Sequence, residues 1–342
     1  MRAVLLYGPG DMRVARVAAP APQPGTVPVG VEVVGICGSD MHVYRAGRLG
    51  SAEISREPFV LGHEVAGRLL VPVPERELDA GALVAIEPQL SCGHCRLCRN
   101  GRSHLCGHAR CLGVPPMAGG LAEILLVDPR QLQPVPESLG AERAALLEPL
   151  AMAMHIVDLA APRWDESAAV LGCGPIGLLV LQLLRLAGCH PLFAIDPVGS
   201  RAEAALLFGA DLPAADPETV LDATGREGVD LVVEATDSPL ALAHAASLAR
   251  RGGRVVMAGI PDGGRYEVDS DSVRSRELAL RFVGRSPRRL ADALDLLRAG
   301  RLELDPLVSH RVDLDYVPDI FARLARDRSG ILKVLVHVGA GR

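Results

Sequence analysis

The chain has 342 residues, of which 49% are hydrophobic and 23% charged, which is typical of a folded globular protein and excludes wholesale disorder. Its 36 basic and 41 acidic residues give a net charge of −5, which argues against a nucleic-acid partner. Because domains usually contain about 100–200 residues, this length predicts two domains.

The first 150 residues are predicted to form a mostly-β domain. Short apolar runs bounded by glycine and proline, such as 27–36 and 81–87, are typical of strands. No long helical period is expected before about Ala141. An apolar helical pattern then begins near Glu148, where Pro149 suits a first helical turn, and this pattern marks the domain boundary.

From about Ser167, predicted strands alternate with predicted helices. This alternation is typical of βαβ units and indicates a doubly wound parallel sheet, so the fold class is α/β. The chain is expected to end with an amphipathic helix over 289–298 and a strand over 331–336. The alternating segments are strands 168–171, 191–195, 229–234 and 253–258, and helices 176–187, 200–208 and 239–250.

No membrane span is expected. The longest uncharged apolar stretch, 168–184, is interrupted by three glycines and a proline, and the N-terminus lacks the apolar core of a signal peptide. We therefore expect a cytoplasmic protein. In that compartment its eight cysteines are expected to be metal ligands or free thiols, because cytosolic disulfides are kept reduced.

A glycine-rich turn follows the predicted strand at 168–171 and opens the next helix. Glycines at this spacing permit a tight turn and a close approach of the backbone to a pyrophosphate, and the helix N-terminus attracts phosphate groups. We therefore predict a dinucleotide site here, with a purely structural turn as the alternative. Its loop residues are Gly172, Gly174, Pro175, Ile176 and Gly177.

Asp196 ends the second predicted strand of this domain, about 20 residues after the turn, where a carboxylate accepts hydrogen bonds from a ribose diol. A carboxylate there repels a 2′-phosphate, so the sequence predicts NAD in preference to NADP. Arg201 lies nearby in the sequence and could pair with such a phosphate. It is therefore included among the cofactor-binding candidates.

Four cysteines lie close together at Cys92, Cys95, Cys98 and Cys106. Four thiolates can close around one tetrahedral zinc ion and leave no open position, which is the pattern of a structural site. A ferredoxin-type run would place its last cysteine after three residues and before a proline, whereas Gly107 follows here. The spacing therefore predicts structural zinc.

A second group of potential zinc ligands is spread along the same half of the chain: Cys37, His63, Glu64 and Glu148. Cysteine, histidine and carboxylate are all zinc ligands, and a catalytic site keeps one position open. Each residue taken singly is also compatible with a structural role, because a buried cysteine commonly acts as a small hydrophobic group. Their combination beside a dinucleotide-binding half favours a catalytic site.

These motifs together resemble the zinc-dependent medium-chain dehydrogenase/reductase superfamily, of the alcohol dehydrogenase type. The resemblance covers essentially the whole chain and includes Gly-His-Glu at 62–64, the four-cysteine lobe, the glycine-rich turn and the 252–261 segment. Within the superfamily the chain most resembles the sorbitol/polyol dehydrogenases, through segments 36–40, 85–88 and 147–150. One departure is Ser286, which replaces a tyrosine of that branch.

The resemblance implies roles for individual residues. It implies a catalytic zinc ion held by Cys37, His63 and Glu64, with Glu148 either as a ligand in place of Glu64 or beside the open position. Asp40 would orient the histidine ligand, because carboxylates in this position fix the imidazole tautomer. The remaining matches are Ser39 and His42 in a proton relay, Arg285 as a substrate contact, and Ile260 beside the nicotinamide.

The resemblance also implies the architecture and the activity. Residues 1–150 and 286–342 would form a mostly-β, GroES-like catalytic domain with both zinc sites, and 151–285 a Rossmann domain. The expected reaction is hydride transfer between NAD and a secondary alcohol, such as a polyol, sugar or cyclitol. The alternatives are L-threonine 3-dehydrogenase, a simple alcohol dehydrogenase, or a catalytically inactive binding protein on this fold. The expected partners are a small-molecule alcohol and further copies of the chain, in a homodimer or homotetramer.

Overall fold

The computed structural model describes residues 1–49, 52–53 and 58–339, and its chain divides into two compact units. Unit 1 comprises Met1–Ala151, Pro287–Ala299 and Val308–Arg342. Unit 2 comprises Met152–Ser286 and Gly300–Leu307.

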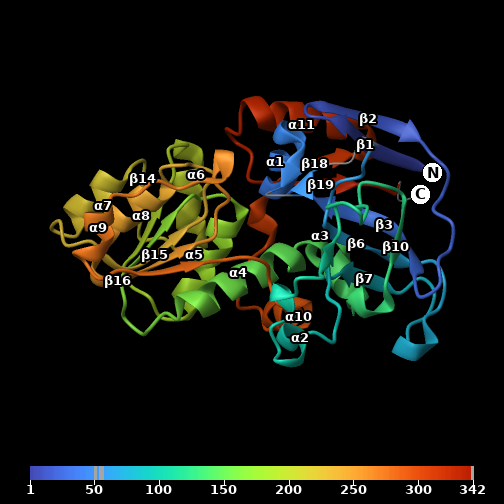
Figure 1. Cartoon of the computed structure of the whole chain (residues 1–342), viewed down its shortest axis with the longest axis horizontal. Helices are drawn as coiled ribbons and strands as arrows, with labels where there is room; N and C mark the ends of the chain where they lie inside the picture. Colours follow the sequence, from blue (N-terminus) through green and yellow to red (C-terminus); the bar gives the residue numbers. More distant parts are fainter. Residues whose placement is uncertain (50–51, 54–57, 340–342) are drawn as a thin grey trace. The chain divides into compact units, whose positions relative to one another are not determined.

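Unit 1 is built on a seven-stranded sheet (Figure 1). Its strand order is β11-β7-β6-β3-β19-β18, and β10 also pairs with β3. The pairings are antiparallel except for that between β18 and β19. The strands are β3 (Val27–Gly35), β6 (Glu64–Leu69), β7 (Leu83–Ile86), β10 (Ile124–Val127), β11 (Leu132–Pro134), β18 (Val308–Asp313) and β19 (Lys333–His337).

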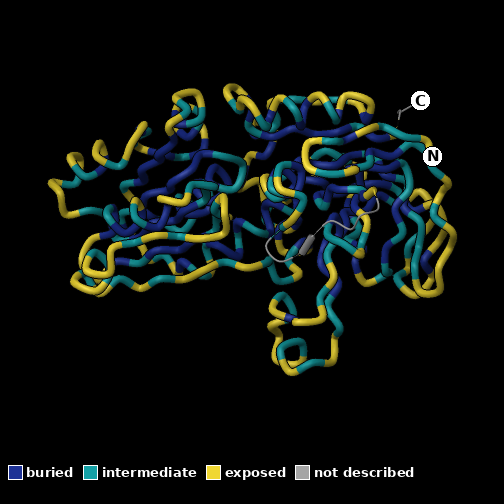
Figure 2. Tube along the Cα trace, turned by 45° about the horizontal axis from the view of Figure 1, so that its top comes forward, coloured by how far each residue is buried: buried dark blue, intermediate teal, exposed yellow. Residues whose placement is uncertain are grey.

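Around this sheet lie a hairpin of β1 (Arg2–Gly8) and β2 (Asp11–Arg16) and several short helices. The apolar side chains of β3 and β6 are buried in one hydrophobic core together with those of α11 (Val317–Arg326). Figure 2 colours buried residues dark blue, and these residues run through the interior of the chain trace. The short apolar runs predicted from the sequence therefore become the strands of this core.

Unit 1 contains a helix that was not expected in its first 150 residues. Residues Gly38–Ala46 form helix α1, although no long helix was predicted before Ala141. The Asp40 side chain accepts a hydrogen bond from the backbone N–H of Cys37 at 3.0 Å, and Gly47 ends the helix with φ of 68°. The ring of Tyr44 packs edge-on against Phe321 of α11, with centroids 5.4 Å apart. Capping and tertiary packing therefore stabilise a helix too short to show a clear apolar period.

Unit 2 contains a six-stranded sheet in which every pairing is parallel. Its order is β14-β13-β12-β15-β16-β17, so the chain begins at β12, builds outward to one side and then crosses to the other. This is the doubly wound arrangement predicted from the sequence. The strands are β12 (Ala168–Leu171), β13 (Leu192–Ile195), β14 (Leu212–Ala214), β15 (Val229–Glu234), β16 (Ala249–Met257) and β17 (Ala279–Phe282).

Helices α5 (Pro175–Leu186) and α8 (Ala241–Leu248) pack against this sheet (Figure 1). Helix α5 connects β12 to β13 and α8 connects β15 to β16, in opposite directions along the sheet. Because such crossovers are right-handed, the two helices cover opposite faces. The predicted helix over 239–250 is too long at both ends. Helix α8 begins only at Ala241, and residues from Ala249 already belong to β16.

Two strands of unit 2 were missed from the sequence. β14 is short, and β17 lies at the sheet edge with mostly exposed residues, so neither has the buried apolar pattern of the central strands. The predicted helix 200–208 is divided into α6 (Gly199–Ala204) and a 3₁₀ segment over Ala205–Phe208. Within residues 1–49, 52–53 and 58–339, no helix is both long enough and apolar enough to cross a membrane.

Candidate zinc and dinucleotide sites

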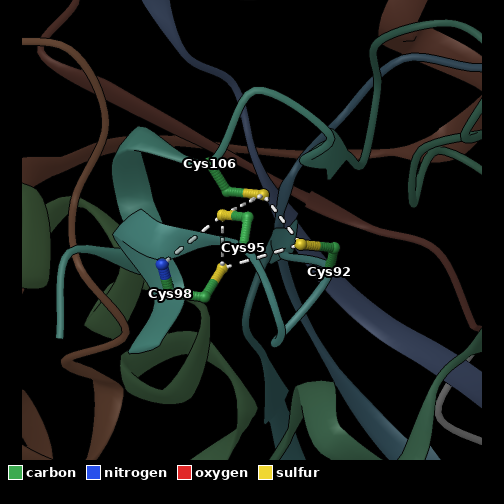
Figure 3. A group of neighbouring side chains, drawn as sticks. All are labelled: Cys92, Cys95, Cys98 and Cys106. Carbon is green, nitrogen blue, oxygen red and sulfur yellow. Dashed lines mark hydrogen bonds between the residues drawn. The ribbon is translucent and has the colours of Figure 1, made fainter. Parts of the chain in front are cut away.

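The four predicted lobe cysteines come together in space (Figure 3). Cys95 caps helix α2 (Arg96–Arg99) and accepts a hydrogen bond from the backbone N–H of Cys98. The neighbouring sulfur pairs around the cluster are 3.5 to 3.9 Å apart, and the four thiols form no disulfide. The chain therefore gathers four sulfur ligands from one short segment.

The spacing of these sulfurs fits a zinc ion. A tetrahedron with Zn–S bonds of about 2.3 Å has sulfur–sulfur edges of roughly 3.8 Å, close to the separations observed. Backbone N–H groups of residues 94 and 95 lower the pKa of Cys92 to about 6, which favours the thiolate that a metal requires. Because all four positions of the tetrahedron are taken by protein, a metal here would have a structural role.

The second cluster contains Cys37, His63 and Glu64, whose ligand atoms lie within 4.8 Å of one another. Cys37 stands between β3 and α1, and His63 immediately precedes Glu64, the first residue of β6. Gly35 pairs with Glu64 across the two strands, and a Cβ at Gly35 would lie 1.9 Å from a Glu64 carboxylate oxygen. Only glycine at this position leaves room for the buried carboxylate.

His63 is oriented by the buried Asp40. The Asp40 Oδ1 lies 3.4 Å from Nδ1 of His63, and the same oxygen accepts the backbone N–H of Gly62 at 3.3 Å. Burial opposes a charge on His63, but Asp40 and Cys37 outweigh it and raise the pKa of the histidine well above its usual range. This contact leaves the other ring nitrogen, Nε2, for a metal.

Glu64 is held by a lysine that the sequence analysis did not single out. Lys333, on β19, is 2% exposed, and its Nζ lies 2.6 Å from both oxygens of Glu64 and 3.0 Å from the carbonyl oxygen of Ile36. Burial lowers the pKa of Lys333, but Glu64 and Cys37 raise it above its usual value. One signal in the sequence could have identified this residue: Lys333 is the only lysine in an arginine-rich chain.

Glu148 lies in the first turn of helix α4 (Leu147–Ala160) and interacts electrostatically with the same group. Among the described residues, the set of Cys37, His63 and Glu64, whose ligand atoms lie within 4.8 Å of one another, does not include Glu148. Burial, with the charge of Glu64 added, raises the pKa of Glu148 to about 7 although His63 and Lys333 oppose this. Burial and the neighbouring Glu148 likewise raise the pKa of Glu87 to about 8.

Ser39 and His42 are both half-buried on helix α1, two and five residues after Cys37. Residues three apart on a helix lie on the same face, so their side chains are neighbours. The unexpected helix therefore positions both predicted relay residues, and its third residue is Asp40.

In unit 2, the glycine-rich turn joins the carboxyl end of β12 to α5, which begins at Pro175 and Ile176. Gly172 has φ of +92°, and a Cβ at Gly177 would lie 1.8 Å from the Gly172 carbonyl oxygen, so both positions require glycine. Nothing lies within 4 Å of a Cβ built at Gly174, which leaves open space beside the helix N-terminus. This geometry suits a bound pyrophosphate.

Asp196 follows β13 and is buried beside the turn. Its two carboxylate oxygens accept the backbone N–H groups of Cys173 and Val198, both at 2.9 Å. Each oxygen can accept a further hydrogen bond, so the carboxylate can still bind a ribose diol. Arg201, on α6, is close enough to oppose the burial-driven rise in the pKa of the Cys173 thiol.

Ile260 and Arg285 follow the carboxyl ends of β16 and β17, and these parallel strands end at the same edge of the sheet as β12. Ile260 is 41% exposed, and Arg285 is half-buried. Their positions along this edge are those expected for residues that line a dinucleotide crevice.

Comparisons with known proteins identify the family. Residues 23–137 match the family model of the alcohol dehydrogenase GroES-like domain, and residues 175–299 match that of the zinc-binding dehydrogenases. The chain belongs to the zinc-dependent alcohol dehydrogenase family. The family resemblance, the pairing of a GroES-like with a Rossmann domain, and the assignment as an oxidoreductase are thereby confirmed.

Relatives within the alcohol dehydrogenase family span nearly the whole chain. Sorbitol dehydrogenase of Bacillus subtilis is 28% identical, with 98% of this chain and 97% of that protein covered. L-Threonine 3-dehydrogenase of Pyrococcus horikoshii is 32% identical, with 91% of each covered. The two differ in the substrates that their names give, so the family match alone leaves the substrate open.

Two solved structures of similar dehydrogenases carry nicotinamide cofactors. RspB from Escherichia coli CFT073, complexed with NADH, has a TM-score of 0.87 and 27% identity and covers 98% of this chain and 99% of its own. A zinc-binding dehydrogenase from Sinorhizobium meliloti 1021, bound to NADP, has a TM-score of 0.87 and 32% identity and covers 98% of each chain. Zinc and a nicotinamide dinucleotide are therefore the cofactors of this family.

Proposed function

We propose that this protein transfers a hydride between NAD and a secondary alcohol or ketone, with a polyol, sugar or cyclitol as substrate. The observation that carries the proposal is the cluster of Cys37, His63 and Glu64. Three protein ligands of mixed type leave a zinc ion one open position, which distinguishes a catalytic site from a structural one. Both this cluster and the dinucleotide turn are intact, which argues against an inactive binding protein.

Zinc in this cluster would polarise the substrate oxygen as a Lewis acid and lower the pKa of the hydroxyl group. The chain's own residues prepare the site. Asp40 holds the Nδ1 side of His63, and Lys333 offsets the charge of Glu64. Because Lys333 is buried beside Glu64, it reduces the cost of placing a thiolate and a carboxylate in the same apolar surroundings.

The proton released by the substrate hydroxyl has a route along helix α1. Ser39 would accept this proton, and His42, one helical turn further along α1, would release it to solvent. The two side chains lie on the same face of the helix, and both are half-buried. The nicotinamide ring supplies the hydride acceptor, and the protein supplies orientation.

NAD is proposed as the preferred cofactor because of Asp196. Its carboxylate lies beside the glycine-rich turn and has lone pairs left for the ribose hydroxyls. A 2′-phosphate in this place would meet a buried negative charge. Arg201 and the relative bound to NADP favour the opposite preference, for NADP over NAD. Affinity for both dinucleotides should therefore be measured on the same preparation.

Glu64 is proposed as the carboxylate ligand of the catalytic zinc, and Glu148 as a neighbouring group. This assignment is supported by the ligand atoms of Glu64, Cys37 and His63, which lie within 4.8 Å of one another. Zinc analysis of Glu64→Gln and Glu148→Gln variants separates the two roles. We expect Glu64→Gln to lose about one zinc ion per chain and Glu148→Gln to retain both. The reverse pattern would assign the ligand to Glu148.

The substrate class is tested by a panel of sorbitol, xylitol, L-idonate, 2,3-butanediol, ethanol and L-threonine, each with NAD and with NADP. We expect kcat/KM to be highest for a polyol with NAD. L-Threonine 3-dehydrogenase is the second candidate, because such a relative is 32% identical. A clear preference for L-threonine, or for ethanol, would replace the polyol assignment. We expect the reaction to take place in the cytoplasm.

We further propose that the active form is a homo-oligomer joined through β17. This strand ends the sheet of unit 2, and Phe282 is 58% exposed. The backbone N–H of Val283 bonds to Met257 of β16, so the N–H of the preceding Phe282 points to the open side. Phe282→Pro should therefore halve the mass in light scattering, while Val283 keeps its bond to β16. An unchanged mass would exclude this interface.

A further inference from the structure

A second buried carboxylate in unit 2 has no place in the reaction described so far. Glu234, the last residue of β15, is completely buried. One carboxylate oxygen accepts the backbone N–H of Thr236 at 2.5 Å and its hydroxyl at 2.7 Å. The other accepts the backbone N–H of Gly259 at 3.2 Å. Burial raises the pKa of Glu234, and the three donors oppose this rise by stabilising the carboxylate.

The carboxylate joins the two chain segments that follow β15 and β16. Thr236 lies in the first segment and Gly259 in the second, and Asp262 N–H to the Asp237 carbonyl at 2.9 Å adds another bond between them. A Cβ at Gly259 would lie 1.9 Å from the Thr236 carbonyl oxygen and 2.7 Å from both Glu234 oxygens. The Tyr266 hydroxyl donates to the Gly259 carbonyl oxygen at 2.8 Å. The two segments are therefore fixed to each other at close range.

Glu234 ends β15, one of the two strands between which the strand order of the sheet reverses. β12 and β15 are neighbours in the sheet, but the chain continues from β12 to β13 on one side and from β15 to β16 on the other. Ligands bind in the crevice outside the carboxyl ends of two such strands. A Cβ at Gly172, the first glycine of the dinucleotide turn, would lie 2.8 Å from the Thr236 methyl and 2.7 Å from the Ala235 carbonyl oxygen. The segment after β15 therefore forms the wall that faces the turn.

The two halves of a bound dinucleotide would meet different strands. Asp196, after β13, lies on one side of the turn, and its carboxylate suits the adenosine ribose. The other half must then lie beyond β12, over the ends of β15 and β16. The segments joined by Glu234 are the protein surface available to that half.

We propose that Glu234 is a positioning residue for the nicotinamide half of the cofactor: it holds the backbone at Thr236 and Gly259 in the arrangement that receives the nicotinamide ring. Glu234 itself is buried and touches no ligand, so it acts through these two segments. The adenosine half, bound by the turn and Asp196, does not depend on it. This proposal rests on the proposed use of a nicotinamide dinucleotide.

The test compares NADH with ADP-ribose, which carries the adenosine and pyrophosphate but lacks the nicotinamide. Affinity for NADH is measured from the change in its fluorescence, and affinity for ADP-ribose by calorimetry. In Glu234→Gln an amide nitrogen faces a backbone N–H, because the amide offers one acceptor oxygen to donors that come from two sides. We expect roughly tenfold weaker NADH binding, the factor for losing one hydrogen bond to a charged group, with ADP-ribose affinity unchanged.

Thr236→Val serves as the second variant, since it keeps the shape of the side chain and removes the hydroxyl, which donates to Glu234 at 2.7 Å and accepts the backbone N–H of Ser238 at 3.2 Å. It should weaken NADH binding in the same selective way but less. The exposed Glu227→Gln is the matched control, because it removes a carboxylate from the surface of the same unit, and it should change neither affinity. If Glu234→Gln is insoluble, the Thr236→Val comparison decides the question.

Equal affinities of Glu234→Gln and the wild type for both ligands would overturn the proposal. So would an equal loss for NADH and ADP-ribose, because that result would mean a general role in folding. If the wild-type protein binds neither ligand, the proposed function fails instead. The two failures are thus distinguishable on the same preparations.

Discussion

The two cysteine-containing clusters of unit 1 are assembled in opposite ways. The lobe cluster takes all its ligands from residues 92–106, and its sulfurs surround a closed tetrahedral space. The second cluster takes Cys37 from the end of β3 and His63 and Glu64 from the start of β6, and Glu64 is paired with Lys333, 269 residues away in the sequence. The first is a local structure, and the second exists only after the sheet has formed.

This difference in assembly corresponds to a difference in role. A closed site of four thiolates can only stabilise the segment that carries it. An open site needs a metal held by fewer ligands, so other parts of the fold must fix those ligands. Asp40 orients His63, and Lys333 holds Glu64 with both distances at 2.6 Å. Four predictions test the two clusters, the proton route and the dinucleotide site, in order of decreasing effect.

The largest effect is expected when the local cluster is broken. Cys98→Ser should lose one zinc ion and much of the folding free energy of the lobe, because binding of a structural zinc contributes directly to folding. Thermal unfolding and zinc content measure the change. The fraction that remains folded should keep kcat close to the wild-type value. A stable variant with low kcat would mean that the lobe takes part in the chemistry.

Lys333→Met tests the support of the assembled cluster. It leaves the buried carboxylate of Glu64 without its partner, and breaking a buried pair in this way costs about 3–5 kcal/mol of unfolding free energy. Urea unfolding of the metal-depleted protein measures this change. Lys333→Arg, which retains the charge, is the control and should be less destabilised. Wild-type stability of Lys333→Met would show that the ion pair contributes nothing to the site.

Ser39→Ala should reduce turnover and leave both clusters intact. Acid–base steps are typically worth about 10²–10⁴-fold, so a loss of kcat in that range is expected with unchanged zinc content and NADH affinity. Steady-state kinetics at several pH values provide the measurement. Near-wild-type turnover of a secondary alcohol would exclude the proposed proton route through helix α1.

Much of this architecture was predictable from the sequence, and the reasons why the rest was not are physical. The lobe was predictable because all four ligands are neighbours in the chain, and the glycine-rich turn because its glycines adjoin a strand and a helix. Helix α1 was missed because a cap and a contact with α11 stabilise it. The Glu64–Lys333 pair was missed because it depends on the pairing of β3 with β19 and β6, which no local pattern encodes.

The smallest effect is expected in unit 2, away from both clusters. Asp196→Asn keeps the shape of the side chain and removes its charge, so affinity for NAD should fall roughly tenfold, as for one hydrogen bond to a charged group. The ratio of NAD to NADP affinity should fall as well, since the repulsion of a 2′-phosphate is removed. Calorimetric titration with both dinucleotides gives the ratio, and an unchanged ratio would show that Asp196 does not select the cofactor.

The comparison of the two clusters predicts that one chain holds two zinc ions in two independent sites. The number of zinc ions is measured by elemental analysis of protein purified without chelator, on the wild type and on the Cys37→Ser and Cys98→Ser variants. We expect two zinc ions per chain in the wild type and one in each variant, with alcohol oxidation lost in Cys37→Ser. One zinc ion in the wild type, or two retained in Cys37→Ser, would contradict this prediction.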